Sequence, residues 1–232
     1  MAFVVVDYCK GNLRSMQRGL ELAGAETLIS ADPVAIAHAE AIVLPGVGAF
    51  ADAATFMHES GQMAVIRERI AAQVPFLGVC LGLHLLFERG EEGMDAGHWA
   101  EGLGILRGEA CRIQSIDAQG LSHKVPHVGW NQVHYRSERS QDLAPLFAGI
   151  EDGSNFYFTH SYQGVPSNET DVLAEVTHAQ TFPCVVRRGS TFGVQFHPEK
   201  SSHKGLAVLR NFVRFAQAGG VGANPCGEGV LT

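Results

Sequence analysis

Phe76-Leu77-Gly78-Val79-Cys80-Leu81-Gly82 is an apolar run of strand type that passes straight into a helical pattern and carries a cysteine between two glycines. A strand that enters a helix through one tight turn forces the turn residue into strained backbone angles and brings its neighbours two positions away against other backbone. Glycine at 78 and 82 leaves room for that approach. Cys80 would then lie at a helix N-terminus, where free amides and the helix dipole favour thiolate over thiol. The spacing marks Cys80 as a candidate nucleophile; the alternative is a buried structural cysteine beside two packing glycines.

A histidine and a carboxylate stand two residues apart in Gly193-Val194-Gln195-Phe196-His197-Pro198-Glu199. Proline restricts the residue before it to extended angles and fixes its own φ, so His197 and Glu199 should project to the same side. A carboxylate beside an imidazole fixes the imidazole tautomer and stabilises its charged form. Cys80, His197 and Glu199 therefore fit the roles of nucleophile, base and orienting group in a catalytic triad.

A third motif, Ile42-Val43-Leu44-Pro45-Gly46-Val47-Gly48, is a buried type of strand that runs into a glycine-bracketed loop. Glycines there let backbone amides point at a ligand, and acyl transfer needs such donors for the developing oxyanion. The amides of Val47 and Leu81 are the candidates. A phosphate cradle is the competing interpretation, but no Lys-Ser/Thr pair follows and the spacing matches neither nucleotide fingerprint.

Taken together, these three motifs resemble class I, triad-type glutamine amidotransferases. Further stretches are similar, more narrowly, to the family of glutaminase subunits of imidazole glycerol phosphate synthase, which acts in histidine biosynthesis. The resemblance runs from about Phe3 to about Phe215. The stretches that carry it are Asp7-Tyr8 with Gly11-Asn12-Leu13-Arg14-Ser15, Pro126-His127-Val128-Gly129-Trp130-Asn131, and Phe156-Tyr157-Phe158-Thr159-His160-Ser161-Tyr162.

The resemblance implies hydrolysis of glutamine to glutamate and ammonia through a glutamyl thioester on Cys80, with no cofactor and no metal. It also implies a heterodimer in which ammonia passes to a separate cyclase subunit with a (β/α)₈ barrel. Substrate-binding positions of the family fall on Gly46, Gly48, His84, Glu92, Ser161 and Tyr162. Partner-facing positions fall on Asn12, Trp130, Asn131, Tyr157 and Lys200, of which Trp130 and Tyr157 could instead be core aromatics.

His84 departs from the family pattern, which commonly has a glutamine four positions after the nucleophile. One helical turn separates Cys80 from His84, so both should face the same side of the helix. We expect a substrate contact, because a histidine can still donate or accept one hydrogen bond. The alternative is that His84 replaces His197 as the base. Glu92 matches an acidic family position for the substrate amino group. Because Glu91 is adjacent, the alignment at this position could be shifted by one residue.

Two other functions stay open at this point. A catalytically silent subunit could keep the fold and only bind the cyclase, or the chain could serve another synthase, for example in amidino-sugar biosynthesis.

Composition agrees with a single α/β domain: 232 residues of which 46% are hydrophobic, enough for one sizeable core. The net charge is −7, whereas proteins that bind nucleic acid typically carry a basic surface, so we do not expect nucleic acid as a partner. Five cysteines at 9, 80, 111, 184 and 226 form no C-x-x-C pair, so we expect free thiols in a reducing compartment. No apolar run approaches the ~18 residues of a membrane span. We therefore expect a cytoplasmic protein without membrane contact.

Apolar runs alternate with helical periods over the first part of the chain. The pattern predicts strands at 3–6, 27–29, 42–44 and 76–79, helices at 14–23, 51–59 and 63–72, and an elbow helix that continues through Phe87. Shorter strands should follow until a closing helix at about 204–216. The predicted fold is α/β, a mostly parallel central sheet with helices on both faces and added antiparallel strands. We place the amidotransferase-like domain at 1–216 and a flexible glycine-rich tail at 217–232.

Overall fold

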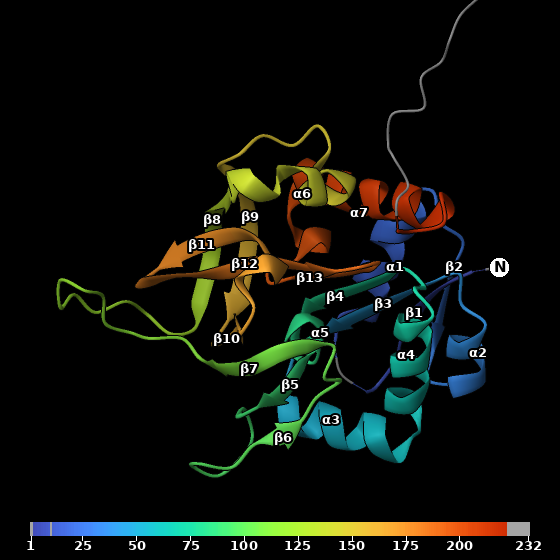
Figure 1. Ribbon diagram of the computed structural model, residues 1–232, viewed down its shortest axis with the longest axis horizontal. Coiled ribbons are helices and arrows are strands. Elements are labelled where there is room, and N and C mark those ends of the chain that lie inside the picture. Colours follow the sequence, from blue (N-terminus) through green and yellow to red (C-terminus); the bar gives the residue numbers. More distant parts are fainter. Residues whose placement is uncertain (1, 10, 222–232) are drawn as a thin grey trace, which may run out of the picture.

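The computed structural model describes residues 2–9 and 11–221. A nine-stranded sheet in the order β2-β1-β3-β4-β13-β12-β11-β8-β9 forms its centre (Figure 1). The first half of the chain contributes β1 (Phe3–Val6), α1 (Leu13–Leu22), β2 (Thr27–Ser30), α2 (Pro33–Ala37), β3 (Ala41–Gly46), α3 (Phe50–Glu59), α4 (Gln62–Ala71), β4 (Phe76–Cys80) and α5 (Leu81–His84). The strands β2, β1, β3, β4 and β13 are mutually parallel.

The second half is mainly antiparallel. It contributes β5 (Phe87–Gly90), β6 (Ala100–Glu101), β7 (Leu106–Arg112), β8 (His127–Tyr135), α6 (Ser140–Phe147), β9 (Ser154–His160), β10 (Tyr162–Pro166), β11 (Val172–His178), β12 (Gln180–Arg188), β13 (Thr191–Val194) and α7 (Ser202–Gln217). A smaller sheet in the order β10-β7-β5-β6 lies beside the central one. The predicted fold class, a mostly parallel sheet with added antiparallel strands, is confirmed.

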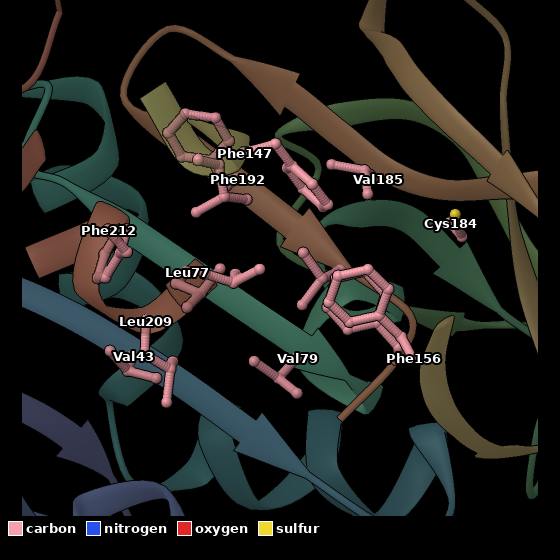
Figure 2. Close-up of a cluster of buried hydrophobic side chains, with 14 of the residues drawn as sticks. Val43, Leu77, Val79, Phe147, Phe156, Cys184, Val185, Phe192, Leu209 and Phe212 are labelled. Carbon is pink, nitrogen blue, oxygen red and sulfur yellow. The ribbon is translucent and has the colours of Figure 1, made fainter. Parts of the chain in front are cut away.

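Both faces of the parallel strands are covered, which explains why β1, β3 and β4 are buried along their whole length. Side chains alternate between the faces because the strand period is two. Val43, Leu77 and Val79 face one apolar cluster, where Leu209 and Phe212 of α7 pack against them (Figure 2). Ile42, Leu44 and Phe76 face a second cluster that includes residues of α3 and α4. Helices α6 and α7 accordingly lie on one side of the sheet and α3 and α4 on the other (Figure 1).

The elbow helix is shorter than the sequence predicted. It ends at His84, and Phe87 opens strand β5 instead of closing the helix. The carbonyl groups of Leu85, Leu86 and Phe87 accept hydrogen bonds from amides in the segment 103–106, so they are not available to a continuing helix. Tertiary pairing thus overrides the apolar helical pattern at this point.

Most other predicted elements are found within a residue or two of their expected ends. Two helices were not predicted, α2 and α6. The first carried a recognisable signal, because Asp32 accepts a hydrogen bond from the Val34 amide and Pro33 occupies the first helical position. The second contains Pro145, which argues against a helix in a sequence reading.

Helix α7 ends at Gln217, and the chain folds back on itself for four more residues. The amide of Gly220 donates to the Phe215 carbonyl, and the amide of Val221 donates to Ser190 Oγ. The rest of the predicted tail, with Cys226, lies outside the described residues, so the domain boundary at 216 stays a prediction. Over 2–9 and 11–221 the cysteines are free thiols and no helix is long and apolar enough to cross a bilayer.

Candidate active site

Cys80 lies at the junction of β4 and α5 with φ 54° and ψ −106°, a strained left-handed conformation for a residue with a side chain. The flanking glycines make this turn possible. A Cβ at Gly78 would overlap the carbonyl of Gly82, and a Cβ at Gly82 would overlap the carbonyl of Leu44 in β3. The strained strand-to-helix turn expected from the glycine spacing is therefore present.

The Cys80 side chain is 5% exposed and has two polar neighbours at hydrogen-bonding range for sulfur. The Gln195 side-chain amide donates to Cys80 Sγ over 3.7 Å. The thiol in turn donates to the Thr159 carbonyl over 4.0 Å. The sulfur thus lies between one hydrogen-bond donor and one acceptor.

His197 follows β13 and pairs with Glu199 through a 2.9 Å contact between Nδ1 and Oε1, with both side chains almost fully buried. Burial lowers the pKa of the imidazole, but Cys80 and Glu199 outweigh it and raise the pKa to about 9. The second ring nitrogen, Nε2, is buried without a hydrogen-bond partner among the described residues. Glu199 therefore holds the imidazole through Nδ1, and Cys80 is the other group that raises its pKa.

Hydrogen bonds from two other segments fix the backbone of His197. Its amide donates to the Tyr157 carbonyl, and Ser201 Oγ donates to the His197 carbonyl over 2.7 Å while accepting from the Tyr157 amide. The imidazole is thus tied to β9 as well as to its own turn.

A pocket of about 240 Å³ opens beside Cys80. It lies at the carboxyl ends of β3 and β4, where ligands bind in open α/β sheets. Eight residues that the sequence singled out for catalysis, oxyanion contact or substrate binding line it: Val47, Gly48, Cys80, Leu81, His84, Glu92, Ser161 and Tyr162. Pro126, Thr159 and His160 complete the wall.

Gly46 is the one predicted substrate residue that does not line this pocket. It pairs with Cys80 across the β3–β4 ladder. A Cβ at Gly46 would overlap the hydroxyl of buried Tyr8, which donates to the Pro45 carbonyl over 2.8 Å. Burial and the neighbouring Cys80 raise the pKa of Tyr8, which keeps the hydroxyl protonated as a donor. Gly46 therefore provides the space that lets Tyr8 fasten the start of the 46–48 loop.

Glu92 is the acidic group of the pocket. Burial and then the nearby Asp52 carboxylate raise its pKa to about 7, while a backbone hydrogen bond from Phe50 acts in the opposite direction. The Glu92 carbonyl accepts from the Ala51 amide, which joins the segment to α3. A half-ionised carboxyl group at neutral pH is well matched to a cationic ligand group.

His84 lines the pocket, but its ring is engaged elsewhere. Its Nε2 lies 2.8 Å from Gln195 Oε1, and only 3% of the residue is exposed. Burial lowers its pKa to about 4, against the opposing effects of Gln195 and the Tyr162 backbone. His84 is consequently neutral at physiological pH.

The predicted partner-facing residues lie mostly at one surface. Trp130 is 54% exposed, which excludes a core role for it. Its ring meets Tyr157 edge-on at 6.0 Å, and Lys200 Nζ lies 5.9 Å above the Tyr157 ring. Half-buried Asn131 donates to the Thr177 carbonyl. Asn12 is exposed at the start of α1, a helix that contacts the turn carrying Lys200.

Five site residues were not identified as such from the sequence: Tyr8, Pro126, Thr159, His160 and Gln195. Gln195 carried a usable signal, because it stands two positions before His197 in an extended segment and should project to the same side. Nothing local marks Thr159, since it takes part through its backbone carbonyl.

The family model for class-I glutamine amidotransferases matches residues 4–215. The chain belongs to this family. Among curated relatives, this amidotransferase is 40% identical over 94% of its length to the imidazole glycerol phosphate synthase subunit HisH of Geobacillus kaustophilus, covering 99% of that protein. It is 45% identical over 90% of its length to the subunit of the same name from Moorella thermoacetica, covering 92% of it.

Solved structures agree on the fold of the amidotransferase. One of a glutamine amidotransferase superposes with a TM-score of 0.66 at 20% identity, covering 92% of this chain and 98% of the other. That of PurLQS from Thermotoga maritima superposes with a TM-score of 0.69 at 19% identity, covering 93% and 99%.

Proposed function

We propose that this chain is the glutaminase subunit of imidazole glycerol phosphate synthase, acting in histidine biosynthesis in the cytoplasm. The observation that carries the proposal is strained Cys80 in the wall of a pocket, with the buried His197–Glu199 pair near enough for the sulfur to raise the pKa of the imidazole. Identity of 40% and 45% to HisH subunits over most of the chain supports the choice of synthase.

The proposed reaction begins with His197 protonated and Cys80 as the thiolate. The sulfur attacks the carboxamide carbon of glutamine, and the proton of His197 passes to the departing nitrogen, which leaves as ammonia. Neutral His197 then takes a proton from water, whose oxygen attacks the resulting thioester. Collapse releases glutamate and restores the ion pair. Glu199 keeps the imidazole oriented in both steps.

Two further roles complete the site. The amides of Val47 and Leu81 would stabilise the oxyanion of each tetrahedral intermediate, since both residues line the pocket beside Cys80. Ionised Glu92 would hold the substrate ammonium group, while Gly48, His84, Ser161 and Tyr162 would shape the space around it. Gly46 would act indirectly, by leaving room for the Tyr8 hydroxyl at the start of the 46–48 loop.

The partner is proposed to be a separate cyclase subunit with a (β/α)₈ barrel that receives the ammonia. Asn12, Trp130, Asn131, Tyr157 and Lys200 would contact it. Exposed Trp130 with its Tyr157 and Lys200 neighbours is typical of an interface anchor, because aromatic residues are enriched at the core of protein interfaces.

The test is co-purification with the candidate cyclase, followed by cyclisation assays with glutamine or with ammonium salts. Cys80→Ala should abolish glutamine-dependent synthesis and leave ammonium-dependent synthesis intact, because the second reaction belongs to the partner. Cys184→Ala is the matched control, since Cys184 is buried in the core and should affect stability alone. Retained glutamine use by the Cys80→Ala complex would end the proposal.

A further inference from the structure

A buried chain of polar contacts links His84 to the sulfur of Cys80 through one glutamine. His84 Nε2 lies 2.8 Å from Gln195 Oε1, and Gln195 Nε2 lies 3.7 Å from Cys80 Sγ. Gln195 is completely buried and His84 nearly so. Two segments far apart in sequence, α5 and the stretch after β13, are thereby joined beside the nucleophile.

The orientation of the Gln195 amide matters because its two ends act on the sulfur in opposite ways. An N–H directed at Sγ stabilises a thiolate, whereas a carbonyl oxygen directed at Sγ destabilises it. The Thr159 carbonyl, 4.0 Å from the sulfur, is already one hydrogen-bond acceptor there. A reversed Gln195 amide would place a second acceptor there.

His84 selects between the two orientations. When the amide presents its N–H to the sulfur, its oxygen faces His84 Nε2 at 2.8 Å, and a buried carbonyl oxygen without a donor would be unfavourable. The ring must then be the tautomer with its proton on Nε2. Burial keeps the ring neutral, while the Tyr162 backbone and Gln195 act against that effect. The other titratable groups that act on this cluster are Tyr8 and His197 at Cys80, and His160 at His84.

We propose that His84 is a positioning residue, which donates from Nε2 to Gln195 Oε1 and thereby holds the Gln195 amide as a hydrogen-bond donor to Cys80 Sγ. The inference rests on the proposed function, in which Cys80 is the nucleophile. It gives His84 a role through Gln195 rather than through the substrate. A glutamine at position 84 would supply an N–H donor of similar reach, so the role is compatible with either side chain.

The experiment measures alkylation of Cys80 by iodoacetamide against pH in the full chain, followed by mass spectrometry of the peptide that carries Cys80. In His84→Leu the midpoint of the alkylation profile should rise by about one pH unit, so that alkylation slows about tenfold at pH values below both midpoints. Gln195→Leu should show the same shift. The double variant should shift no further, because both changes remove one shared contact. His84→Gln should return the profile to that of the unchanged chain.

A control variant distinguishes a specific effect on Cys80 from a general loss of packing. Asn211→Leu removes another buried amide side chain, which donates to the Leu146 and Ala148 carbonyls. It should lower the unfolding temperature without moving the Cys80 profile. If His84→Leu does not fold, His84→Asn replaces it, since asparagine carries an amide that is too short to reach Gln195, and it should show the same slowing.

Three results would overturn the proposal. They are an unchanged Cys80 profile in the folded position-84 variant, shifts in the two single variants that add in the double variant, and failure of His84→Gln to restore the profile. A raised glutamine KM in the reconstituted complex with an unchanged profile would instead assign His84 to direct substrate contact. Alkylation needs no turnover, so this test is independent of whether the synthase assay supports the proposed function.

Discussion

Gly46 and Cys80 are direct partners in the parallel ladder between β3 and β4. The loop that follows Gly46 therefore starts level with Cys80, and Val47 and Gly48 reach the pocket without any intervening segment. Because the ladder fixes both strand ends, sheet geometry sets the distance between the start of the loop and Cys80, and the Tyr8 hydrogen bond to Pro45 reinforces it.

Gly46→Ala should destabilise the fold by about 1 to 3 kcal/mol, because the new methyl group would overlap the Tyr8 hydroxyl. Removing that oxygen with Tyr8→Phe should recover part of the loss, although the hydrogen bond to Pro45 is then also lost. Urea unfolding of the single and double variants measures both effects. Gly149→Ala is the control, since no atom lies within 4 Å of its added carbon and it bears only the strain of φ 73°. Equal losses at 46 and 149 would contradict the prediction.

The pKa of His197, raised to about 9, should fall when either of its partners is removed. Glu199→Gln and Cys80→Ala each leave burial as the stronger influence, so NMR titration of the imidazole should move down by about one to three units. A group with a raised folded-state pKa stabilises the fold below its unfolded value, near 6.5, and that stabilisation is lost as the pH rises through about 9. A His197 pKa unmoved by both substitutions would disprove this coupling.

Glutamine binding should depend on the ionisation of Glu92, whose pKa lies at about 7. Only the carboxylate attracts the substrate ammonium group, so KM should fall as the pH rises from 6 to 8 while kcat changes less. In Glu92→Gln the KM should be higher and should lose this pH dependence. Steady-state kinetics of the reconstituted complex give both numbers. Glu91→Gln tests which of the two neighbouring carboxylates binds the substrate. The Glu91 carboxylate accepts a hydrogen bond from the Arg112 amide, so this variant should keep the KM of the unchanged chain.

Trp130→Ala should weaken binding of the cyclase by about 2 kcal/mol or more, as expected for an aromatic anchor near an interface centre. The fold should be almost unaffected, since Trp130 is largely exposed. Leu28→Ala is the control, because Leu28 is an exposed apolar residue on the edge strand β2. Titration calorimetry with the purified cyclase compares the two variants, and equal affinities would remove Trp130 from the interface.

The parts of the fold and site that could be predicted are those encoded over a few neighbouring residues. The glycines at 78 and 82 predicted the strained turn at Cys80. The proline between His197 and Glu199 predicted that these two side chains pair. Contacts between distant segments left no such signal. The 85–87 run has a helical pattern, yet its carbonyls bind amides of the segment 103–106. The link from His84 to Gln195 spans 111 positions, so no spacing rule reveals it.

Strand β13 is inserted between β4 and β12, although its residues are made more than a hundred positions after β4. Without the residues from 191 onward, the edge of β4 that β13 occupies has no partner, and Cys80 lacks the segment that carries His197 and Glu199. Such an edge invites pairing with other chains. We therefore expect a chain that ends before residue 191 to aggregate and to lack glutaminase activity, and not to act as a partial enzyme.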